Sequence, residues 1–269
     1  MRKAQRWFLV SLALFAGAWM FWQWGEQKRA ASVTAPAQAL KPAKLVPESS
    51  PATNAAPKSA PVSESKPAAT LDKRYPYRLA NTQAGIGQLM RNDRAILLRN
   101  ALIDTGIGTE LPIPAHLRIE GDAGAYIVQA RGAINDAFRQ NLRKAGAVPV
   151  SYIPNNAFLV QANAAAAKQL AAAGDVQAVL PYEPYYKLDQ ELLKLAVEQQ
   201  PLPDDAVLNL VLFPDKRDEA LPVLEKIGAK ILREERTPFG PSVLVQAPAD
   251  SLGPLARWPA VQIIEKAHR

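Results

Sequence analysis

The sequence predicts an α+β protein, in which an N-terminal transmembrane helix and a disordered linker precede two tandem ferredoxin-like (βαββαβ) sandwich domains. Three observations support this fold class. Residues 7–24 form one uncharged apolar stretch, residues 30–72 are rich in proline, alanine and serine, and one pattern of apolar runs and helical stretches occurs twice after residue 124. The expected segments are an anchor or signal segment (1–29), a linker (30–72), a first α+β domain with an N-terminal extension (73–188), a connecting helix and linker (189–203) and a second α+β domain (204–269).

Residues 7–24 carry no charge and as a helix would span about 27 Å, close to the roughly 30 Å hydrocarbon core of a bilayer. Arg2, Lys3 and Arg6 precede the stretch, which favours a cytoplasmic N-terminus. We therefore expect a single-pass protein of a bacterial inner membrane, with its bulk in the periplasm or outside the cell. The interfacial anchors of this helix would be four tryptophans, Trp7, Trp19, Trp22 and Trp24.

A cleaved signal peptide is the alternative for the same segment, because Ala16-Gly17-Ala18 fits a cleavage site and would make the protein secreted. The linker that follows, residues 30–72, has seven prolines and no aromatic residue. Such a segment buries too little apolar surface to offset its ordering entropy, so it is expected to be a disordered tether.

The first copy of the repeated pattern occupies residues 125–182. Its apolar residues alternate in the strands and recur at helical spacing between them, and Gly146 suits the end of the first helix. The expected elements are a strand at 125–130, a helix at 134–145, strands at 148–153 and 157–162, a helix at 164–173 and a strand at 176–182.

The second copy repeats this order after residue 203. Lys144-Ala-Gly146 aligns with Lys226-Ile-Gly228, and Phe158-Leu-Val-Gln-Ala162 aligns with Val243-Leu-Val-Gln-Ala247, which indicates an internal duplication. The expected elements are strands at 207–213, 229–236, 242–247 and 261–266, with helices at 218–227 and 249–257. A copy of about 60 residues is marginally stable alone, so we expect the copies to dock or to lean on a partner.

Two further segments have an expected structure. Residues 189–199 are predicted to form a connecting helix whose contact side carries Leu192, Leu193 and Ala196. In the N-terminal extension, residues 89–101 have a helical pattern and residues 111–114 do not, and we expect the extension to pack against the first copy.

The composition argues against most enzyme chemistries. The chain has no cysteine and only two histidines, His116 and His268, so no disulfide, thiolate or histidine metal centre and no catalytic residue is predicted. The net charge of +7 is concentrated in residues 1–72, where nine basic and four acidic residues give +5. Because the folded part is nearly neutral, no nucleic-acid partner is expected. No motif in the sequence indicates a small-molecule substrate or a cofactor.

Asp104-Thr105-Gly106 invites a catalytic interpretation, but the sequence lacks the flap of an aspartic protease and the His and Ser contexts of a subtilisin triad. We interpret it as an Asp/Gly turn after a helix. Gly85-Ile-Gly87 and Gly106-Ile-Gly108 lack the third glycine of a dinucleotide loop. The tyrosines 182, 185 and 186 are expected to pack on the connecting helix, and Glu234-Glu235 is expected on a solvated strand edge.

Residues 78–269 resemble the N-terminal propeptide region of bacterial subtilisin-like serine proteases. The residues that carry the resemblance are Tyr126-Ile-Val-Gln129, Ala145-Gly-Ala147, 152–160 and 182–188 in the first copy, and Lys226-Ile-Gly-Ala229 and Val261-Gln-Ile-Ile-Glu265 in the second. The resemblance implies a non-enzymatic inhibitor or folding chaperone of a subtilisin-like protease, because no catalytic domain follows Arg269 in this sequence. It also implies that the C-terminal tail enters the protease cleft. This tail consists of Glu265, Lys266, Ala267, His268 and Arg269.

Two alternatives stay open at this point. An anchor, a tether and a terminal βαββαβ domain also describe cell-division modules that bind peptidoglycan glycan strands, and Tyr126-Ile-Val-Gln129 is similar to their first strand. Gly132, however, sits one residue too far from Gln129 for that motif. A non-catalytic, membrane-proximal scaffold is the other alternative.

Overall fold

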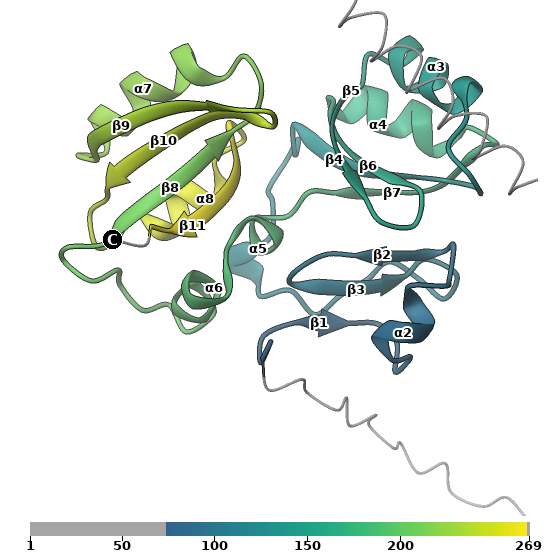
Figure 1. Cartoon of the computed structure of the whole chain (residues 1–269), viewed down its shortest axis with the longest axis horizontal. Coiled ribbons are helices and arrows are strands. Elements are labelled where there is room, and N and C mark those ends of the chain that lie inside the picture. The colour runs from purple at the N-terminus through teal and green to yellow at the C-terminus, as the bar shows by residue number, and fades with distance from the viewer. Residues whose placement is uncertain (1–73, 268–269) are drawn as a thin grey trace, which may run out of the picture. The chain divides into compact units, whose positions relative to one another are not determined.

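The computed structural model describes residues 74–267, which lie in the second of two compact units of the chain, Glu64–Arg269 (Figure 1). The predicted anchor (1–29) and the predicted linker (30–72) lie outside the described residues. The described chain forms three β-sheets, one of three strands and two of four.

The predicted fold class is wrong. The described chain is mostly β-structure and has three sheets where the sequence predicts two, and none of its helices is long and apolar enough to cross a membrane. The same finding contradicts the predicted single-pass localisation in an inner membrane. The residues that carried this prediction, Trp7, Trp19, Trp22 and Trp24, lie outside the described residues.

The additional sheet lies in the N-terminal extension, where the helix predicted at 89–101 includes strand β2 of this sheet. This first sheet has the order β1-β3-β2, built from β1 (Leu79–Ala80), β2 (Ala95–Leu97) and β3 (Ala101–Asp104). The short helix α2 (Ile86–Leu89) lies beside it (Figure 1), whereas the single turn η1 (Ala115–Leu117) contacts the later helix α8 (Leu252–Arg257). β2 and β3 are antiparallel, whereas β1 runs parallel to β3. Asn100 in the turn is fully buried and donates to the carbonyl oxygens of Tyr185 and Leu188 at 2.9 and 2.7 Å. These contacts from distant residues hold a hairpin where the local sequence favours a helix.

The second sheet comes from residues 125–181 and contains the strands and helices expected there. It comprises β4 (Ala125–Ala130), α3 (Asp136–Lys144), β5 (Val148–Ile153), β6 (Ala157–Gln161), α4 (Ala164–Ala171) and β7 (Val176–Pro181), and its strand order is β5-β6-β4-β7. Asn135 and Asn163 cap the two helices by accepting the backbone N–H of Phe138 and Ala166. The helices pack on one face of the sheet over Val128, Val160 and their neighbours.

The third sheet repeats this connectivity with the order β11-β8-β10-β9. It comprises β8 (Val207–Leu212), α7 (Arg217–Lys226), β9 (Lys230–Thr237), β10 (Gly240–Gln246), α8 (Leu252–Arg257) and β11 (Val261–Lys266). In both four-stranded sheets the first strand lies between the third and fourth strands, and every pairing is antiparallel. The two copies therefore share one chain path.

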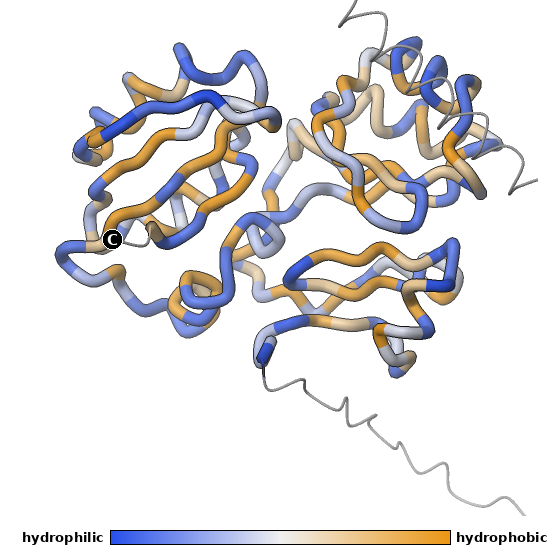
Figure 2. The backbone as a smooth tube through the Cα atoms, viewed as in Figure 1, coloured by the Kyte–Doolittle hydropathy of each residue, from blue (hydrophilic) through white to orange (hydrophobic). Residues whose placement is uncertain are grey.

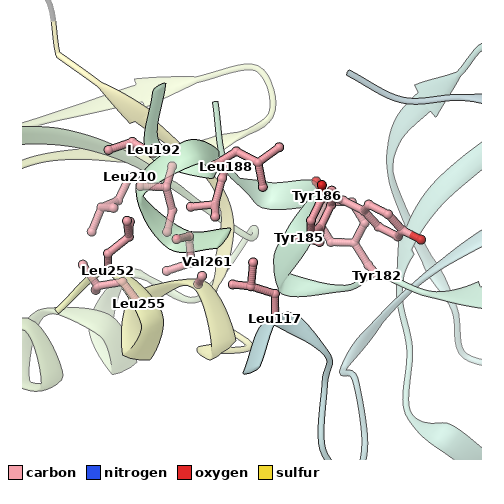
Figure 3. Packing of buried hydrophobic residues seen from close by; sticks show 14 of the residues in the cluster. Leu117, Tyr182, Tyr185, Tyr186, Leu188, Leu192, Leu210, Leu252, Leu255 and Val261 are labelled. Carbon is pink, nitrogen blue, oxygen red and sulfur yellow. The ribbon is translucent and has the colours of Figure 1, made fainter. Parts of the chain in front are cut away.

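Helices α5 (Pro184–Lys187) and α6 (Gln190–Val197) connect the copies. The predicted contact side of the connecting helix is confirmed, because Leu192, Leu193 and Ala196 are buried and Asp189 caps the helix. One hydrophobic cluster runs from the first and second sheets through these helices into the third sheet, so the copies are docked. Figure 3 shows its part between residues 182–192 and the third sheet with its helix α8. The three tyrosines, Tyr182, Tyr185 and Tyr186, belong to it and are core residues.

Candidate functional site

The face of the third sheet that points away from α7 and α8 is the candidate functional site. Along β8, Leu208, Leu210 and Leu212 are fully buried toward the helices. On the opposite face of the strand, Asn209 is half-buried and Val211 is 9% exposed. This alternation is the period-2 pattern of a strand with one packed face and one wet face. We call the face away from the helices the open face, and Ser242 and Val211 on it are buried. Its side chains are those of Asn209, Val211, Arg233, Glu235, Ser242, Leu244, Ile263 and Glu265.

The strand register places these side chains in rows. Asn209 lies opposite Leu244 on one side and Glu265 on the other, and Leu244 lies opposite Arg233. The Ser242 hydroxyl and the Asn209 side-chain oxygen are 2.5 Å apart, and Arg233 Nε is 3.1 Å from Glu235 Oε1. The side chains of Arg233 and Glu235 are 64% and 56% exposed. A hollow of about 340 Å³ lies over this face, so it combines polar groups with a central leucine in a shallow depression.

The matching face of the second sheet is covered. Ile127 and Leu159 share a buried cluster with Ile96 and Ile103 of the three-stranded sheet, so the two sheets pack face to face. Since both four-stranded sheets have the same connectivity, their equivalent faces can be compared directly. The predicted packing of the N-terminal extension on the first copy is confirmed.

Gln129 on β4 holds the three-stranded sheet, which we call the cover, against the second sheet. Its side chain is fully buried, and Nε2 donates to the carbonyl oxygens of Asp93, Ala95 and Asn155 at 3.1, 3.2 and 3.0 Å. Its Oε1 accepts from the Thr105 hydroxyl at 2.8 Å. One side chain therefore ties the cover to the second sheet, and this explains a buried glutamine within a strand of apolar neighbours.

The two equivalent sheet faces carry different side chains in their central row. Ile127 lies opposite Leu159 and Leu180, three apolar side chains that are buried under the cover. At the same places in the second copy, Asn209 lies opposite Leu244 and Glu265. The open face also carries the apolar Val211 and Ile263, and Gln129 takes the place of Val211 on the covered face. Polar groups around a few apolar side chains suit a surface that binds and releases a partner.

The residues predicted to enter a protease cleft lie at one end of this sheet. Glu265 is paired with Arg99 at 3.3 Å, and Lys266 Nζ with Glu191 at 2.8 Å, which raises the pKa of Lys266. The backbone N–H of Lys266 donates to Asp189 at 2.6 Å, and that of Ala267 donates to Val207 at 2.9 Å. The described part of the tail is thus tied to the molecule, while His268 and Arg269 lie outside the described residues.

The motif Asp104-Thr105-Gly106 forms a turn. Asp104 Oδ1 accepts from the Gly106 N–H at 2.8 Å, and Oδ2 accepts from the Asn92 side chain at 2.9 Å. The turn follows strand β3, so the prediction that it follows a helix is wrong. His116 lies elsewhere, with Nε2 2.9 Å from the Ala196 carbonyl oxygen. The carboxylate of Asp104 therefore stabilises the turn through these hydrogen bonds.

Glu183 and Lys187 on α5 are buried ionisable residues that the sequence analysis missed. Burial lowers the pKa of Lys187 to about 7, and its Nζ donates to the Trp258 carbonyl oxygen at 2.9 Å. Burial also raises the pKa of Glu183, whose carboxylate accepts the Ile119 N–H at 2.7 Å. An i, i+4 Glu–Lys pair in sequence usually indicates a solvated helix face, and only the fold reveals that this pair is buried.

The open face was also missed, although the sequence holds a signal for it. Asn209 interrupts an otherwise apolar strand, and Arg233 and Glu235 alternate with Glu234 on the neighbouring edge strand β9. The prediction that Glu234-Glu235 occupies a solvated edge is confirmed, since β9 is exposed along most of its length. Only the strand register shows that these residues from different strands share one face, and the apolar periodicity of the sequence does not give the register.

Comparison with known families gives one match. Residues 97–183 match a family described as a domain of unknown function (DUF8729). The match starts at the end of β2 and includes the whole second sheet, but it stops before the connecting helix and the third sheet. No curated protein and no solved structure matches the chain.

Proposed function

We propose that the protein is a non-catalytic binding protein that docks on a subtilisin-like serine protease through the open face and acts as its inhibitor or folding chaperone. The observation that carries this proposal is the asymmetry between the two copies: one presents its sheet face to solvent and the other has it covered. The resemblance of residues 78–269 to protease propeptides supports the choice of partner.

The chemistry of the open face supports a reversible complex. Interfaces between proteins that also exist apart are about as polar as ordinary surface, with a few apolar side chains at the centre. Leu244 supplies such a centre, and Asn209, Ser242 and the Arg233–Glu235 pair surround it. All of these groups stand on strands, so the surface is ordered before a partner arrives.

The non-catalytic part of the proposal rests on the sequence. The chain has no cysteine, and neither histidine has the neighbours of a subtilisin-type triad. Under the proposal the open face supplies most of the affinity. The hydrogen bonds of Lys266 and Ala267 would have to break before these residues could extend into a cleft.

Inhibition of a panel of subtilisin-like proteases by the full chain tests the proposal. Asn209→Arg places a longer, charged side chain at the centre of the open face and is expected to weaken inhibition at least about 10-fold, because the partner surface cannot close over it. Lys226→Glu, an exposed charge reversal on α7, is the matched control and should leave inhibition unchanged. A chain that ends at Ala267 should inhibit as well as the full chain.

Equal inhibition by the Asn209→Arg variant and the control would contradict docking through the open face. If the full chain inhibits no member of the panel and does not raise the refolding yield of any of them, the protease partner itself is wrong. Binding to purified glycan strands in place of proteases would then favour the peptidoglycan alternative.

A further inference from the structure

The third sheet has one closed edge and one open edge. At β11, Leu188 forms an isolated bridge with Ile264, and the Asp189 N–H donates to the Ile264 carbonyl oxygen at 3.0 Å. At the other edge, the only strand among residues 74–267 that pairs with β9 is β10. The backbone groups on the outer side of β9 are therefore available to another strand.

β9 is the most capable edge strand in residues 74–267. It has eight residues and no proline, whereas the outer strands of the second sheet, β5 and β7, each contain one, Pro149 and Pro181. The outer strands of the first sheet, β1 and β2, have only two and three residues. An eight-residue edge offers enough backbone hydrogen bonds to hold an added strand.

The side chains of β9 alternate in charge between the two faces. Arg233 and Glu235 point to the open face, as their partners Leu244 and Ser242 show, whereas Glu234 points to the helix face opposite Val243. Glu234 is paired there with Arg217 at 2.7 Å. Figure 2 shows the hydrophilic colour along β9 next to the hydrophobic colour of β8 and β10. Leu232, at the bulge in the strand, is 43% exposed.

We propose that β9 pairs with β9 of a second copy of this chain, antiparallel and two-fold symmetric about Glu234, and so joins two four-stranded sheets into one. In such a pair, residues directly opposite each other lie on the same face. With the axis at Glu234, Arg233 of each copy lies opposite Glu235 of the second copy, which gives two ion pairs on the open-face side.

The remaining contacts are compatible with this register. The bulge at Leu232 ends the regular part of the strand, and there Leu232 of each copy lies near Arg236 of the second copy, whose stem can cover the exposed leucine. The two Glu234 carboxylates meet at the axis, and each already has an arginine, Arg217, at 2.7 Å that balances its charge. The like charges at the centre are thus offset from within each copy.

The charge pattern is the reason for choosing a second copy as the occupant. Charged side chains on an edge strand usually repel foreign strands, because few partners carry the opposite charge at each position. A second β9 strand that runs antiparallel does carry the opposite charge at these positions. Arg233 and Glu235 are two positions apart on one face, so the two-fold axis places Arg233 of one copy opposite Glu235 of the other. Arg233 and Glu235 therefore disfavour pairing with foreign strands and favour pairing with β9 of a second copy.

Sedimentation velocity of the full chain over a range of concentrations tests the proposal, which is independent of any protease. The natural chain is expected to show a monomer–dimer equilibrium. Arg233→Glu and Glu235→Arg should each raise the dissociation constant at least about 10-fold, because each places two pairs of like charges in contact. Lys168→Glu, an exposed charge reversal on α4, is the control and should dimerise like the natural chain.

Mixing the two variants gives the decisive result. The first variant has acidic side chains at both positions of the open-face row, and the second has basic side chains at both. Opposite charges then face each other across one interface, so Arg233→Glu mixed with Glu235→Arg should form a heterodimer although each variant alone dimerises poorly. The double variant Arg233→Glu/Glu235→Arg should also recover dimerisation. A natural chain that stays monomeric, or association that neither single reversal weakens, would overturn the proposal.

Discussion

Single buried polar side chains position the larger pieces of this protein. Asn100 and Gln129 are both fully buried, and each uses its amide group to hold backbone carbonyl oxygens of segments distant in sequence. Because an unpaired carbonyl inside a protein costs about 1–3 kcal/mol, these amides select one arrangement of the segments over others. Neither role could be predicted from the sequence, since a lone Asn or Gln gives no indication of which distant carbonyls it will meet.

Lys187 makes stability depend on pH. Its pKa is lowered to about 7 by burial, so between pH 7 and its ordinary value the unfolded chain binds a proton that the folded chain does not. The sign of this difference means that folding becomes more favourable as the pH rises from 7. The contribution is already at its minimum below pH 7, where both states carry the proton.

We therefore expect the free energy of unfolding to rise by up to about 1 kcal/mol per pH unit between pH 7 and 9. Lys187→Met, which keeps the stem and removes the ionisable group, should flatten this rise. Lys226→Met, at an exposed position, should keep it. Urea unfolding at several pH values measures the slopes, and equal slopes in all three proteins would show that Lys187 does not ionise as argued.

Among the secondary-structure elements, those with a strong local pattern were predictable. The strands and helices of the two copies follow their apolar periodicity, and the caps at Asn135, Asn163 and Asp189 mark helix starts. The prediction of a helix at 89–101 was wrong over Ala95–Leu97, which form strand β2, because Ala95, Ile96 and their neighbours fit a helical stripe as well as a strand. The hairpin forms because it covers the second sheet, and this gain is absent from the local sequence.

The β9–β10 hairpin depends on one glycine. Gly240 has φ of +142°, and a Cβ atom there would lie 2.1 Å from the Leu212 carbonyl oxygen. Gly240→Ala should therefore lower the free energy of unfolding by about 2 kcal/mol or more. Gly253→Ala, on α8 with no contact closer than 3.8 Å, should be neutral or stabilising by up to about 1 kcal/mol. Urea denaturation compares the two, and equal effects would contradict the close approach at Gly240.

For the folded unit as a whole, duplication followed by divergence explains the arrangement. One copy packs its largely apolar sheet face under the N-terminal hairpin, and the other has a more polar face on which no other sheet of residues 74–267 packs. The sequence revealed the repeat but not this difference, because register decides which side chains share a face. The localisation prediction depended on residues 7–24, which lie outside the described residues. The fold class also missed the sheet of the N-terminal extension, where part of the helix predicted at 89–101 is strand β2.

The most direct test of docking through the open face uses the absence of cysteine from the chain. Leu244→Cys places a single thiol at the centre of the open face, and Asp136→Cys places one on the exposed side of α3. The rate of maleimide labelling is measured for each full chain with and without a protease that it inhibits. Docking through the open face predicts at least about 10-fold slower labelling at position 244 in the complex and no change at position 136. Unchanged labelling at position 244 in a formed complex would contradict this account.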